Sequence, residues 1–117
     1  MARSRIPHFY RMSPAERLRA VHELGLLTDG DLEKLRSGEA TLDINAADKM
    51  IENVIGVLGM PIGLGLNFLI NERDYVVPLV VEEPSIVAAL SAAAKVARSA
   101  GGFRASSTPP ILASSAT

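Results

Sequence analysis

The sequence predicts an α+β fold, in which N-terminal helices, an apolar connector, a β-hairpin and an alanine-rich helix follow one another along the chain. Three observations support this prediction. A helix-capping pattern begins at Ser13, and two apolar runs rich in β-forming residues flank the polar stretch Asn71 to Asp74. A run of alanine, valine, isoleucine and leucine then extends from Pro84 to Ala100, which is typical of a helix.

The composition indicates one globular domain. The chain has 117 residues, of which 48% are hydrophobic, and this content is sufficient for a core. Only 4% are aromatic and tryptophan is absent, so the core must be aliphatic and rich in alanine. Twelve basic residues oppose thirteen acidic ones, and the net charge of −1 favours neither nucleic acid nor an anionic membrane as a partner.

Residues 1–12 are expected to form an extended arm before the first helix. Ser13 can cap a helix that begins at Pro14, because proline suits the first helical position. Glu16 completes a capping box with Ser13, and Gly25 ends the helix. Together with a second short helix that starts at Thr28, this helix resembles a docking arm more than a catalytic centre.

Two further helices are expected before the apolar connector. The first starts at Thr28 and stops near Gly38, and the second runs over about residues 45–55. Residues 57–66 are apolar but interrupted by glycines, and Pro61 lies among them, so a long regular helix is excluded there.

The β-hairpin is expected to consist of strands at Asn67–Ile70 and Tyr75–Val81, joined by a four-residue loop. The helix that follows starts at Pro84 and ends at Gly101-Gly102. Its Lys95 and Arg98 are expected to form an exposed pair.

One alternative concerns the stretch Val54–Ile70, which contains seventeen residues without a charge. This length reaches the lower limit of a membrane span, and its four glycines would permit close helix packing. Pro61, Asn67 and the absence of charge asymmetry at the flanks oppose a span. A buried loop followed by a strand is the favoured interpretation, and no membrane association is expected.

Two adjacent carboxylates, Glu82 and Glu83, stand where the second strand is expected to end. Because neighbouring strand residues point to opposite faces, at most one of them faces a site. With Pro84 as the first helical residue, Glu83 is the expected cap, where the helix dipole favours the ionised form. A general acid needs a raised pKa instead, so the residues alone favour capping.

The remaining candidate groups indicate no site by themselves. The absence of cysteine excludes disulfides, thiolate metal sites and a cysteine nucleophile within these 117 residues. His8 and His22 form no metal-binding spacing, and neither suggests a base for Ser85, whose hydroxyl could donate to a ligand or bond its own backbone. Gly63-Leu64-Gly65 lacks the third glycine and the preceding strand of a dinucleotide loop.

Two long motifs carry a family resemblance. One is Met50-Ile51-Glu52-Asn53-Val54-Ile55-Gly56, and the other is Val77-Pro78-Leu79-Val80-Val81-Glu82-Glu83-Pro84-Ser85-Ile86-Val87-Ala88-Ala89. Together they resemble the hydroxymethylglutaryl-CoA (HMG-CoA) reductases, in the soluble bacterial class II form. The resemblance extends from Arg5 to about Ser107, with three shorter matches in family order: Met12-Ser13-Pro14, Asn67-Phe68 and Gly101-Gly102-Phe103.

This resemblance implies an oxidoreductase that interconverts HMG-CoA with mevalonate and CoA, using two molecules of NADH or NADPH. It implies that residues 13–103 are the N-terminal part of the large domain, which binds the CoA substrate and forms the dimer. The segment 104–117 is then the start of a missing NAD- or NADP-binding small domain. A homodimer or higher oligomer, a cytoplasmic location and no metal are also implied.

The resemblance also implies roles for single residues. Glu83 is similar to a catalytic glutamate that acts with a lysine, an aspartate and a histidine in proton transfer at the thioester carbonyl and the aldehyde stage. Ser85 is similar to a residue that lines the hydroxymethylglutaryl pocket, and Glu52 and Asn53 match a motif at the dimer interface. Arg11 is a weaker candidate for a CoA phosphate; a solvated helix face is the other interpretation of the N-terminal arginines.

The family enzyme is several times longer than this chain, and its other catalytic groups are expected beyond Thr117. We therefore expect the chain alone to be inactive. The alternative function is a non-catalytic binding module that pairs with a full-length reductase through Glu52 and Asn53. In isolation, Val54–Ile70 lacks partners, and we expect aggregation or loose packing.

Overall fold

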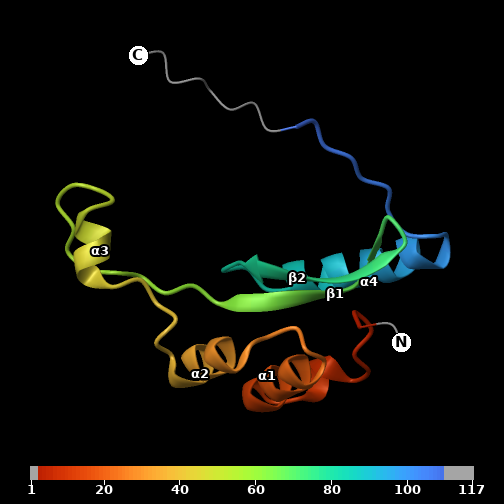
Figure 1. Cartoon of the computed structure of the whole chain (residues 1–117), viewed down its shortest axis with the longest axis horizontal. Coiled ribbons are helices and arrows are strands. Elements are labelled where there is room, and N and C mark those ends of the chain that lie inside the picture. Colours follow the sequence, from red (N-terminus) through yellow and green to blue (C-terminus); the bar gives the residue numbers. More distant parts are fainter. Residues whose placement is uncertain (1–2, 110–117) are drawn as a thin grey trace.

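The computed structural model describes residues 3–109 and has the α+β architecture that the sequence predicts. Residues 110–117 of the expected terminal segment lie outside the described range. The elements in chain order are a short 3₁₀ helix Phe9–Arg11, α1 Pro14–Glu23, α2 Asp29–Ser37, α3 Ile44–Asp48, β1 Ile62–Ile70, β2 Arg73–Val80 and α4 Ile86–Ser99. Figure 1 shows β1, β2 and α4 stacked together, with α1 and α2 facing them and α3 at the far end of the connector.

The two N-terminal helices start as the sequence predicts. Ser13 Oγ accepts the N–H of Glu16 at 3.3 Å, and the N–H of Ser13 donates to Glu16 Oε2 at 2.6 Å. Thr28 and Asp31 form the same reciprocal capping box at the start of α2. Gly38, with φ 78°, ends α2 in the left-handed conformation that glycine adopts freely. Local hydrogen bonds thus define both helices.

The third helix is shorter than the predicted range 45–55, and that prediction was wrong. α3 has 5 residues, and residues 49–61 contain neither helix nor strand. Met50 and Ile51 are 69% and 65% exposed, so the apolar face of the predicted helix has no surface to pack against. Short helices depend on such packing for their stability. Asn53 also adopts φ 58°, which is incompatible with a continuing α-helix.

The hairpin is longer and tighter than predicted. β1 begins at Ile62 rather than Asn67, and the loop contains only Asn71 and Glu72. These two residues have φ values of 50° and 65°, the positive pair of a type I′ turn, which matches the twist of the flanking strands. The other half of the predicted loop belongs to β2, which begins at Arg73.

A β-bulge interrupts β1 between Gly65 and Phe68. Asn67, inside the bulge, has φ 68° and lies outside the pairing with β2. Its N–H donates to the carbonyl oxygen of Ser4 at 2.9 Å, and its Nδ2 donates to the carbonyl oxygen of Ser91 at 3.1 Å. The bulge therefore binds both the N-terminal arm and α4.

α4 packs along β1 and begins two residues later than predicted. Its first residue is Ile86, and Ser85 precedes it with φ 73° and no side-chain capping bond. The prediction that Pro84 opens the helix with Glu83 as its cap is therefore wrong. The left-handed turn at Ser85 reverses the chain between β2 and α4, which the proline alone does not do.

The end of α4 closes the hairpin. Gly102 has φ 81°, and a Cβ there would collide with the carbonyl oxygen of Leu69. The N–H of Phe103 donates to that oxygen at 2.7 Å, and the N–H of Asn71 donates to the carbonyl of Phe103 at 2.9 Å. The rings of Phe103 and Phe68 stack with centroids 6.0 Å apart. The chain after α4 thus docks on the turn end of the hairpin.

Few side chains are fully buried in the described part of the chain. The buried apolar residues are Val21, Ala47 and Ala94, whereas Ile55 and Leu58 in the connector are 103% and 92% exposed. The favoured interpretation of this region as a buried loop is therefore wrong for the connector.

The uncharged stretch Val54–Ile70 does not form a helix. Residues 54–61 belong to the irregular connector, which comprises residues 49–61, and residues 62–70 are β1. Among the residues that the structure describes, no helix is both long enough and apolar enough to cross a membrane.

Candidate functional site

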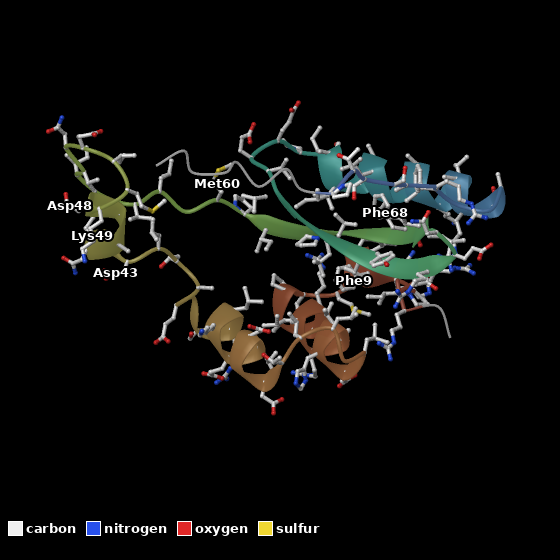
Figure 2. The ribbon with its side chains drawn as sticks, turned by 45° about the horizontal axis from the view of Figure 1, so that its top comes forward. Phe9, Asp43, Asp48, Lys49, Met60 and Phe68 are labelled. Carbon is white, nitrogen blue, oxygen red and sulfur yellow. The ribbon has the colours of Figure 1, made fainter. Side chains whose placement is uncertain are left out.

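An open cavity of about 1380 Å³ lies between the N-terminal helices and the unit formed by the hairpin and α4. Phe9, on the arm, lies between these two layers (Figure 2). Residues of α1 and α2 form one wall, and residues of β1, α4 and the link before α4 form the other. The apolar lining includes Leu18, Val21, Leu64 and Val87.

Glu83 and Ser85 line this cavity from the link between β2 and α4, and both are exposed to solvent. Glu82 is not part of the lining, so only one of the two adjacent carboxylates faces the cavity. Both lie in a bend after β2, which ends at Val80, so strand alternation does not set their directions. The hydroxyl of Ser85 makes no capping bond and can donate to a ligand. A carboxylate and a hydroxyl group thus share one wall of the cavity.

The face of α4 that lines the cavity continues from Ala88 to Ser91 and Lys95. Ser91 has a structural role: its Oγ accepts the N–H of Leu66 at 3.0 Å and donates to the carbonyl of Val87 at 2.9 Å. Lys95 forms no ion pair within residues 3–109, and it adds a positive charge to the wall that holds Glu83.

The opposite wall is basic. Arg17 lines the cavity, but its guanidinium donates to the carbonyl oxygens of Phe9 and Tyr10, each at 3.0 Å, and so holds the arm on α1. Arg5 also lines the cavity and forms no ion pair with any residue that the structure describes. Arg5 and Lys95 are therefore two cationic groups of the lining that can meet an anionic group.

The other sequence-predicted site residues lie elsewhere. Arg11 is exposed, outside the cavity lining, and its guanidinium lies 5.3 Å from the ring centroid of Tyr10. Glu52 and Asn53 are exposed on the connector and line no part of the cavity. The structure thus brings Glu83 and Ser85 together at the cavity, whereas Arg11, Glu52 and Asn53 lie outside it.

A partly buried polar cluster was missed by sequence reasoning. Arg98 Nη1 donates to Asp74 Oδ1 at 2.6 Å, and the hydroxyl of Ser4 donates to the same oxygen. The bond from Arg98 holds the pKa of Asp74 below its ordinary value, and Ser4 lowers it further, against the opposing effect of burial. The prediction that Arg98 is exposed was wrong, since its side chain is 17% exposed. No local spacing signals the cluster, because its members come from three distant segments.

Within residues 3–109, no group of three or more histidine, cysteine or acidic side chains is placed to hold a metal ion. Gly63-Leu64-Gly65, the segment weighed as a nucleotide loop, lies inside β1. A Cβ at Gly63 would lie 3.3 Å from Val87 Cγ2, so this glycine serves the close approach of α4.

The comparisons with known proteins agree on one family. The family model of hydroxymethylglutaryl-coenzyme A reductase matches residues 13–115. The 3-hydroxy-3-methylglutaryl-coenzyme A reductase of Archaeoglobus fulgidus is 47% identical over 109 residues, which are 93% of this chain and 24% of that protein. A probable reductase of the same name from Borreliella burgdorferi is 51% identical over 51 residues, 44% of this chain and 12% of that protein.

A solved structure shows the same fold over most of the described residues. The class II 3-hydroxy-3-methylglutaryl-CoA reductase from Streptococcus pneumoniae, bound to NADPH in open conformations, has a TM-score of 0.78 and 37% identity. The match covers 84% of this chain and 26% of that one. The chain therefore spans about a quarter of the A. fulgidus and S. pneumoniae proteins, and its match to the B. burgdorferi protein covers 12% of that protein.

Proposed function

The chain belongs to the hydroxymethylglutaryl-coenzyme A reductase family, and from this premise we propose that it supplies the N-terminal part of the large domain of such an enzyme. The complete enzyme interconverts HMG-CoA with mevalonate and CoA, using NADH or NADPH, in the cytoplasm. The observation that carries this proposal is the cavity with Glu83 and Ser85 on one wall. The 117 residues by themselves do not catalyse the reaction.

Glu83 transfers protons at the reacting carbonyl in this proposal. Reduction of a thioester carbonyl places negative charge on its oxygen, so a proton must reach that oxygen or the departing thiolate. Ser85 donates a hydrogen bond to the carboxylate or the carbonyl of the substrate and orients it. Arg5 and Lys95 line the same cavity, and we add them to Arg11 as candidates for the CoA phosphates, because CoA carries several negative charges.

The dinucleotide is not held by the residues described here. The candidate glycines at 63 and 65 pack within a strand, and residues 3–109 offer no glycine-rich turn from a strand into a helix. The binding of NADH or NADPH is therefore assigned to other parts of the complete enzyme.

Glu52 and Asn53 belong to a dimer interface in this proposal. They lie on the connector, where Met50, Ile51 and Ile55 expose apolar side chains next to them. Such an exposed apolar segment favours burial against a partner.

The roles of the two adjacent glutamates give the sharpest test. In the complete reductase that carries these residues, Glu83→Gln lowers kcat by about 10²- to 10⁴-fold, the range for loss of a general acid or base. Glu82→Gln is the matched control, because Glu82 is exposed and outside the cavity, and its kcat stays close to that of the parent. Equal losses in both variants would contradict the role of Glu83.

The inactivity of the 117 residues is tested separately. The purified chain is mixed with HMG-CoA and NADPH or NADH, and the nicotinamide absorbance is followed over time. We expect no decrease. Turnover by the chain alone would overturn this part of the proposal while leaving the assignment to the family intact.

A second candidate is a non-catalytic module that pairs with a full-length reductase. The exposed apolar side chains around Glu52 and Asn53 favour it, since a heterodimer would bury them as a homodimer does. Co-purification of a tagged chain with a co-expressed full-length reductase distinguishes this candidate, and failure to co-purify removes it.

A further inference from the structure

The partly buried cluster of Ser4, Asp74 and Arg98 joins three segments that are distant in sequence. Ser4 is fully buried, and its hydroxyl donates to Asp74 of β2. Arg98 of α4 donates to the same carboxylate and lies 3.3 Å from Ser4 Oγ. The backbone adds a fourth connection, because the bulge in β1 leaves the N–H of Asn67 free of β2 and this N–H donates to the carbonyl of Ser4.

The arm that carries Ser4 has a second anchor at its other end. Arg17 of α1 holds the carbonyl oxygens of Phe9 and Tyr10. The arm residues between the two anchors, residues 5–8, line the cavity. The position of α1 relative to the hairpin thus depends on a short segment that is fixed at both ends.

Direct packing between the two layers is slight. α1 packs on α2, whereas β2 and α4 pack on β1, and neither α1 nor α2 makes extensive contact with the hairpin. The space between them is the cavity. If the arm moves, little packing against the hairpin therefore opposes a movement of the wall formed by α1 and α2.

We propose that Ser4, Asp74 and Arg98 form a latch that holds the N-terminal arm on the hairpin and thereby sets the width of the cavity. None of the three residues lines the cavity, so they are positioning residues that act on a ligand through the arm. The latch goes beyond the proposed function, because it holds for any ligand that the cavity takes.

The absence of cysteine makes a direct test simple, because two introduced cysteines carry the only spin labels. One pair, Arg19→Cys on α1 and Ala92→Cys on α4, reports the distance across the cavity in the full 117-residue chain. Both positions are exposed and outside the cavity lining. A second pair, Val80→Cys on β2 with Ala92→Cys, reports the packing of the hairpin against α4.

With the latch intact, electron paramagnetic resonance gives a narrow distance distribution for both pairs. We expect Ser4→Ala and Asp74→Asn to broaden the α1–α4 distribution and shift it to longer distances, while the β2–α4 distribution stays narrow. Asp74→Glu keeps a carboxylate and restores part of the narrow component. Glu72→Gln is the matched control: it breaks the exposed pair with Arg104 on the same hairpin and leaves both distributions unchanged.

Two outcomes overturn the proposal. A narrow α1–α4 distribution in both Ser4→Ala and Asp74→Asn shows that the arm is held by other contacts. Broadening of both distributions shows that the cluster stabilises the hairpin and α4 as a whole rather than the arm.

Discussion

Two neighbouring segments of this chain are both apolar and contain glycines, yet only one of them forms regular structure. The connector, residues 49–61, includes Gly56 and Gly59 and has neither helix nor strand. β1 follows at once, includes Gly63 and Gly65, and pairs with β2 on either side of its bulge.

The difference lies in the partners of the two segments. Gly63 lies against Val87 of α4, and a Cβ at Gly65 would be 3.0 Å from the ring of Phe68. Around Gly56 and Gly59 there is no atom within 4 Å of an added Cβ. Apolar composition sets which residues can be buried, but a partner surface decides whether they form a strand.

A substitution at Ala94 is expected to have the largest effect on stability, and it tests whether α4 is the partner surface of β1. Ala94 on α4 is 1% exposed, so Ala94→Asp buries an unpaired charge where the helix packs. We expect the free energy of unfolding to fall by about 3–5 kcal/mol, measured by denaturant titration with circular dichroism. Ala93→Asp, at an exposed position one residue away, is the control and stays near the parent value. Equal effects would mean that this face of α4 is not packed.

Gly102→Ala tests the docking of the chain on the hairpin end. The substitution forces a side chain into the left-handed region and against Leu69, and we expect a loss of about 1–3 kcal/mol in unfolding free energy. Gly59→Ala in the connector is the control, because its added methyl meets nothing within 4 Å and its φ is not positive. A neutral Gly102→Ala variant would show that the contact with Leu69 does not form in solution.

Acidification tests the partly buried cluster of Ser4, Asp74 and Arg98, which lies near the same turn end of the hairpin, because Asp74 pairs with Leu69. The folded-state pKa of Asp74 lies below its ordinary value of 3.8, so this group stabilises the fold above that pH and the stabilisation is lost as pH falls through the lower folded pKa. Glu16 and Asp31, whose pKa values the helix caps lower, act in the same direction. The denaturant concentration at the unfolding midpoint is therefore expected to decrease when the pH falls below about 4. Asp74→Asn reduces this drop, and an unchanged drop in that variant would exclude the contribution of Asp74.

Leu58→Asp has the smallest expected effect on stability. Leu58 is 92% exposed on the connector, so the unfolding free energy changes by less than about 0.5 kcal/mol. Self-association should decrease, because the charge falls within the exposed apolar segment, and sedimentation velocity measures that change. A clear loss of stability would show that the connector packs in solution.

The N-terminal helices could be read from the sequence because their signals are local. The box Ser13–Glu16 joins residues three positions apart and forms as expected, and α2 starts at the predicted Thr28, where Asp31 completes a second box. The prediction of the third helix was wrong for the opposite reason. Its apolar periodicity is real, but Met50 and Ile51 remain exposed among residues 3–109, and periodicity without a partner surface does not stabilise a helix.

The candidate site was only partly predictable. Strand alternation predicts that at most one of Glu82 and Glu83 faces a site. Only Glu83 lines the cavity, but both residues lie in the bend after β2, so the link before α4 rather than a strand sets their directions. The left-handed Ser85 was not predicted, since serine rarely adopts that conformation and the proline before it suggested a helix start. The place of Lys95 on the cavity wall depends on the angle at which α4 crosses β1, which no sequence pattern expresses.

The sequence by itself determined the α+β class, the order of the elements, the capped starts of α1 and α2, and the family to which the chain belongs. These features depend on residues close together along the chain or on long motifs. Only the tertiary structure decided the length of β1, the exposure of the connector, the common wall of Glu83 and Ser85, and the cluster of Ser4, Asp74 and Arg98. Those features join residues up to 94 positions apart. The contacts that stabilise them form only once the chain has folded around the bulge in β1.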